Sequence, residues 1–108
     1  MQIDQTKKKY INIGYLVQKV FHQNKEADKN HYLKLLEKNN NKYTSNLFKK
    51  LYPWVVQKCD EYQLGYDDLL EQTSILLLST DELNNVGAGY YFVLGMTCSD
   101  DLFKEINK

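Results

Sequence analysis

Cysteine and histidine, the side chains most often used as nucleophiles and metal ligands, are sparse in this sequence. Cys59 and Cys98 stand alone rather than in a CxxC pair, and His22 lies nine residues from His31, which is not the spacing of zinc ligands on one helix. Cys59 is followed by Asp60, and a negative neighbour raises the pKa of a thiol, which opposes its activation as a nucleophile. The sequence therefore predicts no metal site and no cysteine nucleophile.

Glycine is concentrated at one point, in Gly87-Ala88-Gly89. This segment begins like a dinucleotide-binding loop, but Phe92 stands where such a loop requires its third glycine. Small residues that allow close packing or a turn are the simpler interpretation. The GxSxG and HExxH motifs of hydrolases and metalloproteases do not occur. We expect no catalytic residues and no cofactor, and we expect that the chain is not an enzyme.

Seven acidic and aromatic residues surround Gly65, and we call them the acidic corner: Asp60, Glu61, Tyr62, Tyr66, Asp67, Asp68 and Glu71. Asp67 and Asp68 suit the start of a helix, where the helix dipole stabilises negative charge. That explanation fails for Asp60 and Glu61, because they precede the predicted end of a helix, where negative charge is unfavourable. Tyrosine is enriched among residues that dominate binding energy. We therefore expect the acidic corner to bind a basic protein partner, with Tyr62 or Tyr66 as an aromatic anchor.

Basic and acidic residues are divided between the two halves of the chain. Residues 1–58 contain twelve Lys and four acids, a net charge of +8, and residues 59–108 contain two Lys and ten acids, a net charge of −8. The halves either neutralise each other within the fold or present charged surfaces to partners. All fourteen basic residues are Lys, and only Arg reads guanine through two hydrogen bonds held in a rigid fork. Specific nucleic-acid recognition is therefore not expected.

Apolar residues recur every three or four positions along much of the chain, which is the pattern of amphipathic helices. The pattern predicts helices over 5–23 and 27–39. A third helix, capped by Thr44 or Ser45, extends toward Gly65, and Pro53 either kinks it or begins a separate helix.

The last third of the chain contains two further start signals. A helix from Tyr66 is expected to break near Ser79, because Ser79 and Glu82 have the spacing of a capping box that begins the next helix. Ser99 is expected to cap a last short helix. The sequence thus predicts one all-α domain over 1–108, a compact bundle of five to six short helices. A hairpin around 75–98, giving an α+β fold, is the alternative, because 75–80 and 90–98 are also rich in strand-forming residues.

Several classes of protein are excluded by length and composition. The 108 residues suffice for one core, and no apolar run reaches the roughly 18 residues of a membrane-spanning helix, so we expect no membrane partner. Asn12 and Gln18 interrupt the apolar stretch that follows the N-terminal lysines, which argues against a signal peptide, and two unpaired thiols suit a reducing compartment. A cytoplasmic protein is expected.

Together these features favour a small cytoplasmic protein that binds and inhibits or neutralises another protein. An immunity protein or antitoxin against a bacterial toxin, or a phage-encoded inhibitor, would have this size and this acidic surface, and its partner would be a basic toxin or nuclease. Two alternatives belong to other classes. One is a nucleic-acid-associated protein that uses the Lys-rich first half. The other is a self-assembling structural subunit, a homo-oligomer in which the positive half of one copy meets the negative half of the next.

Overall fold

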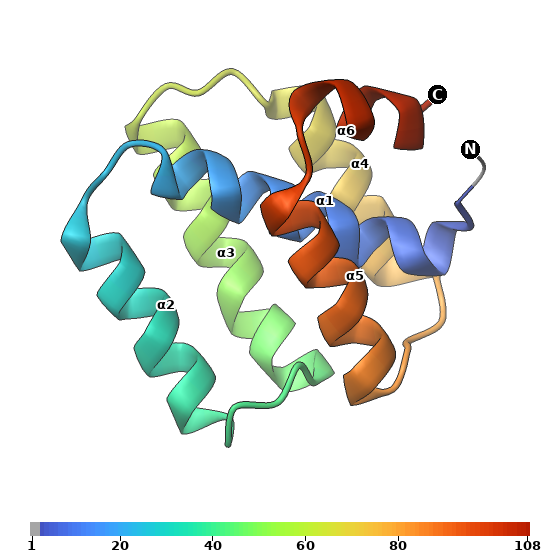
Figure 1. Ribbon diagram of the computed structural model, residues 1–108, viewed down its shortest axis with the longest axis horizontal. Coiled ribbons are helices and arrows are strands. Elements are labelled where there is room, and N and C mark those ends of the chain that lie inside the picture. The colour runs from blue at the N-terminus through green and yellow to red at the C-terminus, as the bar shows by residue number, and fades with distance from the viewer. Residues whose placement is uncertain (1–2) are drawn as a thin grey trace.

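The computed structural model describes residues 3–108, and these form six α-helices joined by short loops (Figure 1). In chain order the helices are α1 (Gln5–Phe21), α2 (Glu26–Lys38), α3 (Ser45–Glu61), α4 (Asp67–Ser79), α5 (Asn85–Thr97) and α6 (Asp100–Ile106). The described residues include no strand. The all-α prediction is confirmed, and the alternative of a hairpin around 75–98 is wrong, because α4 and α5 occupy that part of the chain.

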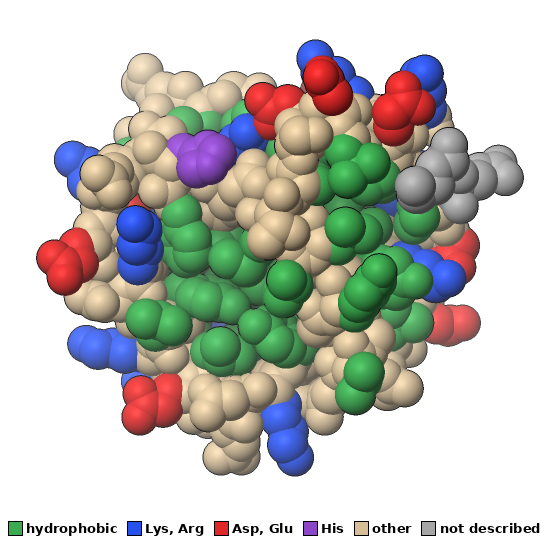
Figure 2. All heavy atoms as spheres, viewed as in Figure 1, with side chains coloured by type: hydrophobic (Ala, Val, Ile, Leu, Met, Phe, Trp, Pro, Cys, Tyr) green, Lys and Arg blue, Asp and Glu red, His purple; other side chains and the backbone are tan. Residues whose placement is uncertain are grey.

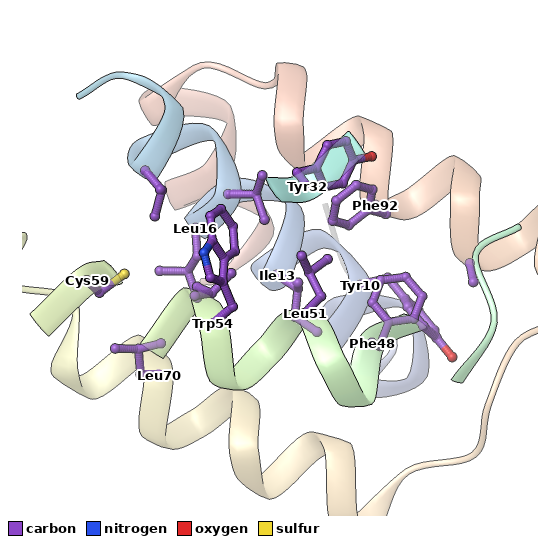
Figure 3. Packing of buried hydrophobic residues seen from close by; sticks show 14 residues of the cluster. Tyr10, Ile13, Leu16, Tyr32, Phe48, Leu51, Trp54, Cys59, Leu70 and Phe92 are labelled. Carbon is purple, nitrogen blue, oxygen red and sulfur yellow. The ribbon is translucent and has the colours of Figure 1, made fainter. Parts of the chain in front are cut away.

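Helix α1 is the centre of the fold and contacts α2, α3, α4 and α5. Ten of its seventeen residues are buried, because apolar side chains lie on both of its faces. One face joins the main hydrophobic core, where Ile13 and Leu16 of α1 meet Leu51 of α3 (Figure 3). The other face forms a second cluster with α6, in which the ring of Tyr15 stacks on that of Phe103 with centroids 3.7 Å apart.

The predicted caps begin two of the helices. The hydroxyl of Thr44 accepts a hydrogen bond from the backbone N–H of Leu47 at 3.4 Å, and α3 starts at the next residue. The hydroxyl of Ser99 likewise accepts from the N–H of Leu102 at 3.1 Å at the start of α6. Pro53 neither ends α3 nor begins a new helix. Pro53 is exposed, and because proline has no N–H, it donates no hydrogen bond to the carbonyl of Lys49.

The predicted capping box of Ser79 and Glu82 is wrong. The break after Ser79 is present, but Ser79 is the last residue of α4, and its hydroxyl donates to the carbonyl of Ile75 at 2.7 Å. Helix α5 begins six residues later, with Asn84 as its cap: the Asn84 side chain accepts a hydrogen bond from the N–H of Gly87 at 2.8 Å. An N-cap side chain accepts from the N–H of a residue two or three positions later, and Ser79 lies six residues before the start of α5, so it cannot cap that helix.

Helices α1 and α5 touch through their backbones, and two glycines make this possible. A Cβ atom added at Gly14 would lie 2.0 Å from the carbonyl oxygen of Phe92, and one added at Gly95 would lie 2.0 Å from that of Ile11. Contacts this short cannot be relieved by rotating a side chain, because the obstructing atoms belong to the backbone. The glycines therefore fix how closely the central helix and α5 approach each other.

Candidate functional site

The acidic corner lies where α3 ends and α4 begins. Asp60 and Glu61 are the last two residues of α3, and α4 starts at Asp67. Gly65 lies in the turn between the helices with a φ of +80°, a backbone conformation that glycine adopts without steric cost. The turn brings Asp60 and Asp67 to the rim of one surface hollow of about 250 Å³. All five acids of the corner are exposed.

The carboxylates of the corner are largely unpaired. Glu61 accepts from the Nζ of Lys58 at 2.8 Å. Within residues 3–108, none of the other four acids has a cationic group within the 4.0 Å of an ion pair. Asp67 and Asp68 gain from the dipole of α4, because they lie in its first turn. Asp60 has no such compensation, since it lies at the negative end of α3.

The two tyrosines of the corner are engaged inside the fold. Tyr62 is half-buried, and its hydroxyl donates to the Oδ2 of Asp28 at 2.5 Å. Asp28 is only 2% exposed, and its other oxygen lies 3.5 Å from the Nζ of Lys58, so this group links α2 to the end of α3. The ring of Tyr66 packs edge-on against that of Tyr15, with centroids 6.1 Å apart. Each tyrosine is therefore half-buried and held by a contact within the fold, rather than projecting freely into solvent.

Neither cysteine has the environment of a reactive thiol. Burial, and then the negative charge of Asp67, raise the pKa of the Cys59 thiol to about 11, so it is protonated at neutral pH. Cys98 is also buried, and burial raises its pKa as well. Across residues 3–108 no three His, Cys, Asp or Glu side chains converge as metal ligands do. In the same range no helix has the length and apolarity needed to cross a membrane.

Most charged residues of the two halves do not form ion pairs with each other inside the fold. In the described part of the chain, the pairs that join the halves are Lys58–Glu61 and Lys19–Asp100. Lys9 does not contribute to the positive surface expected of the first half, because it is only 2% exposed and its Nζ donates to the carbonyl of Thr80 at 3.4 Å. Most acids of the second half thus face solvent without a cationic partner.

A second surface was not predicted from the sequence. Helix α5 exposes three large apolar side chains, with exposed fractions of 83% for Val86, 64% for Tyr90 and 44% for Val93. The signal was present in the sequence, because no charged residue occurs between Asn84 and Ser99. A helix that is apolar on every side is normally buried on every side, whereas α5 packs against α1 with one side only. We call these three side chains the α5 face.

Comparison of the chain with protein-family models, with curated proteins and with solved structures finds no match. No relative therefore supplies a function, a partner or a set of functional residues. The charge, exposure and contacts of the chain's own residues are what a functional argument can use.

Proposed function

We propose that this chain is a small cytoplasmic protein, without catalytic activity of its own, that binds and inhibits or neutralises a basic protein through the acidic corner. An immunity protein or antitoxin directed against a bacterial toxin, or a phage-encoded inhibitor, acts in this way. The observation that carries the proposal is Asp60: an exposed, unpaired carboxylate at the negative end of α3, beside Asp67.

The stability of the fold does not account for Asp60 at this position. Negative charge near a helix C-terminus costs a few tenths of a kcal/mol to about 1 kcal/mol, and Asp60 has no ion pair among residues 3–108 that would offset the cost. Nearby Asp67 adds repulsion of like charges. A positively charged surface of another protein would place cations opposite Asp60 and Asp67. Their attraction would offset both the cost of negative charge at the end of α3 and the repulsion between the two carboxylates.

The expected contribution of the acids is to the rate and selectivity of binding. Complementary charge speeds the encounter of two proteins and disfavours partners of the wrong sign, while desolvated apolar and aromatic contacts supply most of the affinity. At this site the half-buried Tyr62 and Tyr66 are the aromatic residues next to the acids. A basic cleft, such as the active site of a nuclease toxin, is the kind of surface that this corner would cover.

The test compares two double variants with the same change in charge. Asp60→Lys/Glu71→Lys reverses two exposed, unpaired acids of the corner, and Asp81→Lys/Glu82→Lys reverses two exposed acids of the α4–α5 loop. Each protein is used to capture partners from the native host, and the captured protein is then purified. Calorimetry gives its affinity for each variant, and stopped-flow fluorescence gives the association rate at low and high salt.

We expect the corner variant to lose at least tenfold in affinity, mostly through a slower association rate at low salt. The loop variant should bind nearly as the unmodified protein does. Melting curves of the three proteins show whether a loss of binding reflects a loss of fold. Equal binding by both variants would refute the proposal, as would capture of nucleic acid rather than a basic protein.

A further inference from the structure

A hollow of about 200 Å³ is lined by residues of α1, α3 and α4 and of the loop that follows α4. The buried rings of Tyr10 and Phe48, whose centroids are 5.0 Å apart, belong to its wall (Figure 3). The half-buried side chains of Tyr52 and Leu77 add further apolar surface. An apolar cavity of about 150 Å³ can hold a benzene molecule. This hollow therefore has room for one aromatic ring with a short substituent.

One buried cation belongs to the wall of the hollow. Lys9 lines it and is only 2% exposed. The Nζ of Lys9 lies 5.2 Å from the centroid of the Tyr10 ring and donates to the carbonyl of Thr80 at 3.4 Å, which is long for a hydrogen bond. An ammonium group has three donors, and within residues 3–108 no carboxylate lies within 4.0 Å of this one. A buried charge with so few partners is costly.

The acids whose charge reaches Lys9 do not compensate for its burial. Glu82 also lines the hollow, and Asp81 precedes it in the chain. Burial lowers the pKa of the Lys9 amine, whereas the negative charges of Glu82 and Asp81 raise it, and the net shift is downward. Both acids are exposed, so water screens their charge. A carboxylate inside the hollow would meet the ammonium group at closer range and with less screening.

We propose that this hollow binds a small organic carboxylate with one apolar ring, and that Lys9 pairs with the carboxylate. The ring would lie among the aromatic side chains of Tyr10, Phe48 and Tyr52. Lys49 also lines the hollow and is exposed, so it adds positive charge that attracts an anion. A single negative charge matches the one buried cation.

The buried cation distinguishes this hollow from the other apolar surface of the molecule. Hydrophobic side chains also gather over α5, on the side seen in Figure 2, but α5 has no charged residue that would select an occupant. The proposal does not rest on the function proposed above, because no residue of the acidic corner lines the hollow. Either proposal can therefore fail without the other.

The first experiment compares two probes that share a ring and differ in charge, phenylacetate and phenylacetamide. Each is titrated into the isotope-labelled protein, and NMR spectra of the backbone amides report where it binds and how tightly. We expect phenylacetate to bind about tenfold more tightly, because a hydrogen bond to a charged group contributes that much. The amides that shift should belong to the residues that line the hollow. Equal affinity for both probes, shifts confined to another surface, or no saturable binding of phenylacetate at millimolar concentrations overturns the proposal.

The second experiment removes the cation. Lys9→Met keeps an unbranched apolar side chain, and Lys8→Met is the matched control, because it removes the same charge from the neighbouring residue, which lies outside the hollow. Lys9→Met should bind phenylacetate about tenfold more weakly and phenylacetamide as before, whereas Lys8→Met should bind both as the unmodified protein does. Equal loss in the two lysine variants, or no loss in Lys9→Met, overturns the proposal.

A third variant keeps Lys9 in place, and so tests the proposal even if Lys9→Met does not fold. Glu82→Gln removes an exposed negative charge from the lining of the hollow. It should bind phenylacetate more tightly at low salt, because the repulsion between Glu82 and the bound carboxylate is gone. Melting curves of all variants show whether each is folded. Unchanged or weaker binding of phenylacetate by folded Glu82→Gln contradicts a carboxylate site in this hollow.

Discussion

Replacing Gly95 by alanine tests whether the backbone contact between α1 and α5 determines the stability of the fold. The added Cβ would lie 2.0 Å from the carbonyl oxygen of Ile11 and 2.9 Å from the backbone nitrogen of Tyr15. Carbon and oxygen atoms in close contact lie about 3.3 Å apart, so the two helices would have to separate by about 1.3 Å. Because α1 lies in the core, that separation loosens the packing around it.

Two effects oppose each other in this variant. Alanine stabilises a helix interior over glycine by about 1 kcal/mol. Overpacking a core costs about 1–3 kcal/mol and occasionally more, and here the obstructing atoms cannot rotate away. We expect a net loss of about 2 kcal/mol, which lowers the melting temperature of a domain this size by about 10 °C.

The matched control is Gly87→Ala in the same helix. Its Cβ would meet its nearest neighbours at 3.4 and 3.5 Å, which is ordinary contact, so the variant should be as stable as the unmodified protein or gain up to about 1 kcal/mol. Urea denaturation of both variants, followed by circular dichroism, measures the difference. If Gly95→Ala proves as stable as Gly87→Ala, the close approach of α1 and α5 does not determine stability and the reasoning fails.

Two further predictions concern polar groups. Asp28→Ala removes the buried acceptor of Tyr62 and an ion-pair partner of Lys58, and urea denaturation should show a loss of about 1–3 kcal/mol. Asp68→Ala, at an exposed and unpaired position in the first turn of α4, should lose only the contribution of the helix dipole, about 0.3–1 kcal/mol. Hydrogen bonds from Lys19 and Tyr15 hold the pKa of Asp100 below its ordinary value of 3.8, so their stabilisation is present above that pH and lost as the pH falls through the lowered value. Asp100→Asn should therefore show a smaller fall in melting temperature between about pH 5 and pH 2 than the unmodified protein; an unchanged fall would contradict this.

The helices could be predicted because their signals are local. The spacing of apolar residues placed α1 and α2 nearly at their observed ends, and Thr44 and Ser99 cap the helices they were expected to cap. The start of α5 was misplaced because a serine hydroxyl can bond back into its own helix as well as forward, and spacing alone does not distinguish the two.

The environment of the candidate site depended on contacts between distant residues. The exposure of the five acids could be expected from the sequence, because they surround a glycine that indicates a turn between two helices. The engagement of Tyr62 does not, because its acceptor, Asp28, lies 34 residues away on another helix. Asp28 itself stands among polar residues of α2, and nothing in its local pattern marks it as buried.

The central position of α1 has a consequence for the order in which the protein acquires its structure. Helix α1 is synthesised before α5 and α6, yet it contacts groups of both: Tyr15, for example, donates its hydrogen bond to Asp100 of α6, 85 residues later. Until α5 and α6 have emerged from the ribosome, the surfaces of α1 that pack against these two helices have no permanent cover. Structures rich in such distant contacts fold more slowly than those built from neighbouring segments, and their exposed surfaces are open to aggregation meanwhile. The nascent chain therefore has to keep the apolar residues of α1 from wrong contacts until α5 and α6 have been made.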